Sequence, residues 1–257
     1  MIYTLGHKQK FCHHLSSSKS NIERKSQEMK PELIIALDVP CSDKIPSIVD
    51  ALPPSISFYK VGLEIFTSDG PSALTYLKKT NRNIFLDLKL HDIPRTVSRA
   101  VASASKHGIS LLTVHAGGGR EMLKAAAASA RDCGNLKIIA VTTLTSLNSS
   151  DLAEMGVTRP LLDHTLALGE MAISAGIDGL VCSPNEASAF RKIIGDKPIL
   201  ITPGIRPAGT DVGDQKRIAT PEMAVKAGAS HLVVGRPILE AKNPRAAAEE
   251  ILRQMGV

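Results

Sequence analysis

The sequence predicts an α/β fold, a single (β/α)8 TIM barrel. A short apolar run followed by a helical stretch recurs eight times after residue 33. Alternation of this kind implies a parallel sheet, and eight units in one domain-length chain fit a closed barrel. Polar side chains also gather at the carboxyl ends of the apolar runs, where such barrels carry their active sites. A doubly wound open sheet is the alternative, although the turn after the first run, residues 38–41, lacks the glycine-rich fingerprint usual there.

Each expected strand is a short apolar run, rich in Val, Ile and Leu, as buried parallel strands are. In chain order the strands are expected at 33–39, 58–63, 84–90, 111–116, 137–144, 179–183, 199–205 and 231–236.

The stretches between these runs have helix signals at both ends. Proline is favoured in the first helical turn and glycine just past the last one. The prolines are Pro71, Pro94, Pro160, Pro184, Pro221 and Pro244, and the glycines are Gly108, Gly134, Gly176, Gly195 and Gly228. Helices are therefore expected at 43–51, 70–80, 94–107, 119–131, 160–175, 184–194, 220–227 and 244–254.

Composition excludes several classes of function. The 257 residues can bury a full core, and no apolar run approaches the length of a membrane span, so we expect no membrane partner. Aromatic residues are scarce and Trp is absent, which argues against base-stacking platforms. The formal charge is +6, but residues 1–30 hold six Lys or Arg against two Glu. The excess charge sits mainly in this tail, and we expect no nucleic-acid partner.

Residues 1–30 are expected to form a disordered basic extension, and residues 31–257 the catalytic barrel. The extension is rich in Ser, Lys, His and Asn and lacks both apolar periodicity and the apolar stretch of a secretory signal. A transit peptide and a separate polyanion-binding role for the tail stay open as alternatives. The four cysteines are scattered without a C-x-x-C pair, which favours reduced thiols and a cytoplasmic location.

The first three strands place charge where a buried strand should have none. Strand alternation puts Asp87 and Lys89 on the same face as Phe85, while Asp38 and Lys60 stand at the ends of the first two strands. Buried ions are tolerable when opposite charges neutralise one another. A lysine held in such a set is positioned to give a proton to carbon or nitrogen, whereas the alternative is an inert ion-pair network.

The last two strands predict a phosphate site. Gly-containing turns bring Arg206 and Arg236 to the ends of strands seven and eight, where barrels commonly hold phosphate. Arginine suits this role because its planar fork can contact two phosphate oxygens. No metal site is expected, although Asp87, Asp92 and His115 could build one in a related barrel.

The segment Asp87-Leu-Lys-Leu-His-Asp-Ile-Pro-Arg-Thr96 resembles the signature of the orotidine 5′-phosphate decarboxylase family. The resemblance extends, in the family's order, over about residues 31–257. The further segments that carry it are 36–38, 59–62, 114–116, 141–146, 202–206, 214–217 and 233–236.

This resemblance implies a carboxy-lyase that converts orotidine 5′-phosphate to UMP, the last step of de novo pyrimidine nucleotide synthesis. It also implies catalysis without metal or organic cofactor, in a homodimer with shared active sites. Lys89 would donate the proton to C6 of the pyrimidine. Lys60, Asp87 and Lys89 would form the charged array together with Asp92 of the partner subunit.

The substrate contacts that the resemblance implies involve most of the strand ends. Asp38 and Lys60 would hold ribose hydroxyls, and Thr96 would reach the ribose across the dimer. Gln215, in a closing loop, would link base and phosphate. The remaining contacts would be Thr145 beside the pyrimidine, Pro203, and Arg206, Gly235 and Arg236 at the phosphate end.

Two other functions stay open at this point. One is a related barrel decarboxylase acting on a sugar-acid phosphate, in which a similar D-x-K-x-x-D motif would hold Mg²⁺. The continuation 93–96 and the segment around Gln215 favour the nucleotide enzyme instead. The other is a non-catalytic nucleotide-binding barrel, which the intact charged set argues against.

Overall fold

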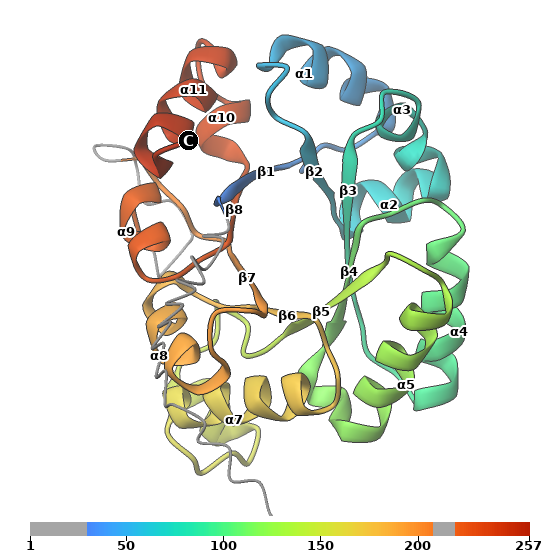
Figure 1. Ribbon diagram of the computed structural model, residues 1–257, viewed down its shortest axis with the longest axis vertical. Coiled ribbons are helices and arrows are strands. Elements are labelled where there is room, and N and C mark those ends of the chain that lie inside the picture. Colours follow the sequence, from blue (N-terminus) through green and yellow to red (C-terminus); the bar gives the residue numbers. More distant parts are fainter. Residues whose placement is uncertain (1–29, 208–218) are drawn as a thin grey trace, which may run out of the picture.

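The described part of the computed structural model, residues 30–207 and 219–257, forms a closed barrel of eight parallel strands in sequential order. Helices surround the ring on its outer side, as the view along the barrel in Figure 1 shows. The predicted (β/α)8 barrel is confirmed, and the open sheet is wrong because β1 pairs with β8.

All eight predicted strands are present, each trimmed by a few residues at its carboxyl end except β3. The residues beyond these ends belong to the loops at the mouth of the barrel. The strands are β1 (Glu32–Ala36), β2 (Phe58–Val61), β3 (Asn83–Leu90), β4 (Leu111–His115), β5 (Lys137–Val141), β6 (Gly179–Val181), β7 (Ile199–Thr202) and β8 (His231–Val234).

Every helix that the sequence predicts is also present. The first begins as a 3₁₀ turn, η1 (Ser42–Lys44), and continues as α1 (Ile45–Ala51), while the one expected at 70–80 is split into η2 (Gly70–Leu74) and α3 (Thr75–Lys79). The others are α4 (Pro94–Ser105), α5 (Gly119–Asp132) after the 3₁₀ turn η3 (Ala116–Gly118), α7 (Leu161–Ser174), α8 (Pro184–Ile194), α9 (Pro221–Lys226) and α11 (Pro244–Met255).

Three short helices were not predicted: α2 (Leu63–Asp69), α6 (Ser149–Glu154) and α10 (Arg236–Leu239). Each has two turns or fewer, which is too short for an apolar periodicity to be recognisable. The one signal that could have revealed α6 is its capping box, in which Asn148 and Asp151 each bond the other's backbone N–H.

The core consists of two apolar layers. The larger layer fills the space between strands and helices, and a smaller one fills the inside of the barrel. The inner layer contains Ile34, Ala36, Phe58, Phe85, Leu111, Ile139, Ile201 and Val233, all at most 8 % exposed. Within the described residues the barrel is therefore packed at its centre, and a cavity opens above this layer, at the carboxyl ends of the strands.

The described residues also bear on two features of composition. Cys41, Cys133 and Cys182 are free thiols, as the scattered spacing predicts. Within 30–207 and 219–257, no helix combines the length and apolar character needed to cross a membrane. The predicted extension falls almost entirely on residues 1–29, which lie outside the described residues.

His231 occupies the opposite end of the barrel from the mouth, at the start of β8. Its Nδ1 lies 3.0 Å from Ser230 Oγ and its Nε2 3.7 Å from Glu32 Oε1, and its ring packs edge-on against Phe58. Burial lowers the pKa of His231 to about 4 and raises the pKa of Glu32, so both shifts disfavour an ion pair between them.

We therefore expect the free energy of unfolding to fall as the pH drops from about 6.5 to about 4, because in this window the unfolded chain binds a proton that folded His231 does not. Between pH 7 and pH 4.5 this histidine should account for about 2 kcal/mol of lost stability. Urea unfolding at both pH values measures this loss. The free energy of unfolding of His231→Gln should change between them by about 2 kcal/mol less than that of the wild type. His107→Gln, a change between α4 and β4, serves as the control, and equal pH dependence in both variants would contradict the assignment.

Candidate active site

The end of β3 departs from regular strand geometry. Its register with β4 shifts between Leu86 and Leu90, and Lys89 has a φ of 50°. Positive φ is uncommon outside glycine, and a left-handed residue of this kind costs roughly 1–2 kcal/mol. Asp87 and Lys89 nevertheless both line the cavity above Phe85, as strand alternation predicts. The irregularity thus lies at the centre of the predicted charged segment.

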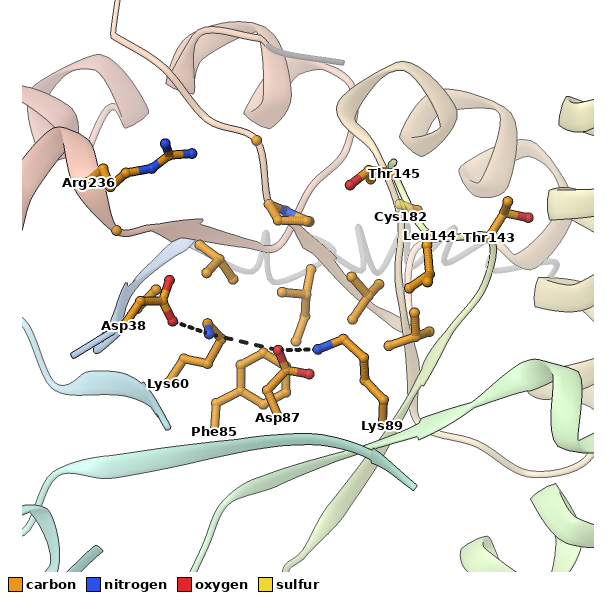
Figure 2. A pocket seen from close by; sticks show the side chains of 18 of the residues that line it. Asp38, Lys60, Phe85, Asp87, Lys89, Thr143, Leu144, Thr145, Cys182 and Arg236 are labelled. Carbon is orange, nitrogen blue, oxygen red and sulfur yellow. Dashed lines mark hydrogen bonds and ion pairs between the residues drawn. The ribbon is translucent and has the colours of Figure 1, made fainter. Parts of the chain in front are cut away.

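Four charged side chains form a line across the floor of the cavity, shown with dashed contacts in Figure 2. Lys60 Nζ lies 2.9 Å from Asp38 Oδ1 and 3.9 Å from Asp87 Oδ2. Lys89 Nζ lies 2.9 Å from the same Asp87 oxygen. The structure therefore brings together the four residues that the sequence placed at the ends of the first three strands.

Burial differs along this line. The side chains of Lys60 and Asp87 are 12 % and 13 % exposed, Lys89 is 32 % exposed, and Asp38, at the rim, is 57 % exposed. Removing ions from water is costly unless opposite charges compensate them. Alternation of sign provides that compensation, and it leaves the ammonium of Lys89 as the end of the line that faces into the cavity (Figure 2).

Thr113 supports this line from β4 and was missed at the sequence level. Its side chain is fully buried, its Oγ1 donates to Asp87 Oδ1 at 2.9 Å, and it accepts the backbone N–H of Lys89 at 2.8 Å. Within the apolar run 111–114 a single threonine gave no signal, because β-branched residues are ordinary in strands.

The cavity has a volume of about 250 Å³ and is lined from all sides of the barrel except β4. Its predicted members are Asp38, Lys60, Asp87, Lys89, Thr145, Pro203, Arg206, Gly235 and Arg236. In Figure 2, Arg236 lies above the Asp38 end of the charged line and Thr145 above its Lys89 end. A ligand that spans this distance can therefore contact a cationic end and a polar end at the same time.

The two arginines differ in their surroundings. Arg206 is only 8 % exposed and donates to the carbonyl of Ile205 at 3.0 Å, whereas Arg236 is exposed. Gly235 sits beside Arg236 at the end of β8. Gly235 and Arg236 thus line the cavity at the end of β8, where the sequence predicted a phosphate site.

Several other side chains that line the cavity were not predicted. The apolar floor comes from the inner core layer, and Leu144 and Cys182 add to the wall beside Thr143, which belongs to the predicted polar end of strand five. Burial strongly raises the pKa of the Cys182 thiol, which therefore stays protonated at neutral pH. Such residues resemble ordinary strand residues in the sequence, and only the closure of the barrel turns them toward the site.

Two predicted site residues within the described part of the chain, Asp92 and Thr96, are not among those that line the cavity. Asp92 and Thr96 are exposed beyond the end of β3, where Asp92 Oδ1 accepts the N–H of Ile93 at 2.6 Å. Ile93 itself is 66 % exposed. Gln215 and most of the predicted closing loop lie outside the described residues.

His91 and His115 stack on each other beside this site. Their rings are nearly parallel, with centroids 5.1 Å apart, and Nδ1 of His115 accepts the N–H of Gly117 at 3.0 Å. Burial, followed by the charges of His91 and Lys89, lowers the pKa of His115. Across 30–207 and 219–257, no three or more His, Cys, Asp or Glu side chains group closely enough to hold a metal ion.

Fold and site together define a class: a (β/α)8-barrel enzyme with its charged residues at the carboxyl ends of the strands. Comparison with known proteins gives the family. Residues 31–251 match the model of the orotidine 5′-phosphate decarboxylase / HUMPS family. This chain therefore belongs to that family and is a carboxy-lyase.

Individual relatives agree with this assignment. The orotidine 5′-phosphate decarboxylase of Rhodopseudomonas palustris (strain BisB5) is 47 % identical over 226 residues, covering 88 % of this chain and 95 % of the relative. The enzyme of the same name from Gloeothece citriformis is 45 % identical, covering 87 % and 97 %. The crystal structure of the Lactobacillus acidophilus orotidine 5′-phosphate decarboxylase superposes with a TM-score of 0.80 at 38 % identity, covering 88 % of this chain and all of that one.

Proposed function

We propose that this chain converts orotidine 5′-phosphate to UMP and CO₂ without metal or organic cofactor, with Lys89 as the proton donor to C6. The observation that carries the proposal is the line Asp38–Lys60–Asp87–Lys89, which ends in an ammonium group inside the cavity. Family membership and the names of the relatives support the substrate.

The chemistry needs a fixed positive charge at one carbon atom. Breaking the bond between C6 and the carboxylate releases CO₂ and leaves the electron pair on C6, with little delocalisation. The Lys89 ammonium stabilises this developing charge, and one of its N–H protons then forms the new C6–H bond. The amine regains a proton from water after product release. Asp87 keeps the ammonium in place through its 2.9 Å contact.

The phosphate of the substrate would bind at Gly235 and Arg236, together with Arg206, which also lines the cavity. In this orientation the pyrimidine lies over Lys89 and beside Thr145, and the ribose hydroxyls lie near Asp38 and Lys60. Binding energy gained at the phosphate, remote from C6, can then be used to hold the reacting carbon against the ammonium.

The remaining site residues would come from a second subunit of a homodimer. Asp92 and Thr96 are exposed and are not among the residues that line their own chain's cavity, and the exposed Ile93 between them supplies apolar surface for a contact. In a dimer with two-fold symmetry, Asp92 and Thr96 of each chain would complete the site of the other.

The first prediction tests the proton donor. Lys89→Ala should lower kcat by at least about 1,000-fold, because it removes both the proton and the charge that stabilises the carbanion. Spectrophotometric loss of orotidine 5′-phosphate, with EDTA present throughout, measures this. Lys124→Ala, which removes a surface lysine paired with Glu121 on α5, should leave the rate unchanged.

Two outcomes would overturn the proposal. Near-normal turnover in Lys89→Ala would remove the assigned donor. Loss of wild-type activity in EDTA, restored by Mg²⁺, would contradict catalysis without metal and would favour the alternative in which the D-x-K-x-x-D motif holds Mg²⁺. UMP binding to Lys89→Ala, measured by calorimetry, checks that the variant cavity is intact.

A second prediction concerns the phosphate end. Arg236→Ala should raise KM by about 10- to 100-fold, because a charge-assisted contact to the phosphate is lost. Arg236→Lys should recover only part of this, since it keeps the charge but not the planar fork. An unchanged preference for nucleotide over nucleoside in Arg236→Ala would contradict the assignment.

The third prediction tests sharing of sites. Lys89→Ala and Asp92→Ala should each be inactive, but mixing the two chains should recover about a quarter of the wild-type activity, because half of the dimers are mixed and each has one intact site.

A matched mixture provides the control. Lys89→Ala combined with Asp87→Ala should stay inactive, because both residues serve the site of their own chain. Absence of recovery in the first mixture, with mixed dimers demonstrated by mass spectrometry, would count against shared sites.

A further inference from the structure

We propose that Thr113 is a positioning residue, whose hydroxyl fixes both the Asp87 carboxylate and the backbone of Lys89 in the geometry that proton transfer requires. This inference rests on the roles proposed above for Asp87 and Lys89. The observation is the pair of hydrogen bonds that meet at Thr113 Oγ1, 2.9 Å from Asp87 Oδ1 and 2.8 Å from Lys89 N.

The direction of these two bonds follows from the chemistry of the groups. The backbone N–H of Lys89 can only donate, so the hydroxyl oxygen of Thr113 accepts from it. The single hydroxyl proton is then free to point to Asp87, whose ionised carboxylate can only accept. Both bonds are satisfied in one arrangement only, and the hydroxyl of Thr113 therefore links the two residues with a defined polarity.

The bond to the backbone replaces a missing contact of the sheet. Between Leu86 and Leu90 the register of β3 against β4 shifts, and Lys89 takes the left-handed φ of 50° within this interval. A left-handed residue persists only where its surroundings hold it. Thr113, fully buried on the facing strand, supplies that support to the Lys89 N–H through its side chain.

The bond to Thr113 gives the two carboxylate oxygens of Asp87 different partners. Oδ1 is held by Thr113, while Oδ2 faces Lys89 Nζ at 2.9 Å and Lys60 Nζ at 3.9 Å. Rotation of the carboxylate would break the hydrogen bond to Oδ1, so this bond favours the orientation in which Oδ2 is directed at both ammonium groups. Thr113 does not line the cavity, so it would act through Asp87 and Lys89 and not on the substrate.

The test compares variants that keep or remove the hydroxyl. Thr113→Val has nearly the same shape but no hydroxyl, and we expect kcat to fall by about 10- to 100-fold with KM changed by less than about threefold. Thr113→Ser keeps the hydroxyl and should stay within about threefold of the wild-type kcat. Thr113→Ala removes the hydroxyl without placing a methyl group against Asp87, and should lose kcat as Thr113→Val does.

A control separates this role from simple packing. Thr142, directly after β5, is equally buried, but its hydroxyl donates to the carbonyl of Val181, and Thr142→Val should retain normal kcat. Thermal unfolding of every variant identifies loss of activity through misfolding, and should Thr113→Val not fold, Thr113→Ala against Thr113→Ser decides the question.

The outcomes are distinct from those of the proposed function. Full kcat in folded Thr113→Val or Thr113→Ala, or a Thr113→Ser variant as impaired as Thr113→Val, would overturn the role of Thr113. An active Lys89→Ala enzyme assayed in parallel would overturn the proposed proton donor itself. An inactive Lys89→Ala with reduced kcat in the two hydroxyl-deleted variants and rescue in Thr113→Ser supports both.

Discussion

Closure of the sheet is the constraint on which the rest of this structure depends. Because β1 pairs with both β2 and β8, no strand of the described barrel keeps an unpaired edge. All strands run parallel, so their carboxyl ends meet at one mouth. Residues from opposite ends of the sequence thereby become neighbours: a Cβ added to Gly235 would lie 3.4 Å from Asp38 Oδ2. The position of the cavity is thus set by the closure of the barrel, which brings the lining residues together at one end.

The charged line depends in turn on the apolar layer beneath it. Asp87 follows Phe85 on the inward face of β3, so a carboxylate stands directly above the packed interior. An ion in that position is stable only with partners on both sides, and Lys60 and Lys89 provide them. The groups therefore form a unit: removing any one leaves its neighbours uncompensated, and the effects of separate substitutions in it will not add.

Much of this arrangement could be predicted from the sequence, because it follows from repeating patterns. Apolar runs placed all eight strands, and proline and glycine punctuation placed the longer helices. Charge inside an apolar run, at Asp87 and Lys89, pointed to residues that line the cavity, and the family assignment based on the surrounding motif is confirmed.

The parts that the sequence did not predict depend on single local events. The short helices α2, α6 and α10 have too few turns for periodicity. The left-handed backbone of Lys89 arises from a register shift that leaves no pattern in the residues. In the sequence Thr113 is an ordinary β-branched strand residue, and its contacts to Asp87 and Lys89 exist only because β4 pairs with β3. Asp92 and Thr96 are exposed beyond the end of β3, and the role predicted for them depends on the second subunit proposed above.

The inner apolar layer also determines how small molecules can enter and leave the cavity. Its residues are at most 8 % exposed and fill the barrel below the cavity, so in the described structure there is no channel through the middle. The cavity is a dead end. In the proposed binding mode, a nucleotide at the mouth would block the route by which CO₂ formed at the floor of the cavity must escape. CO₂ and the nucleotide product would therefore leave through the same opening. CO₂ would have to pass the bound nucleotide or leave after it.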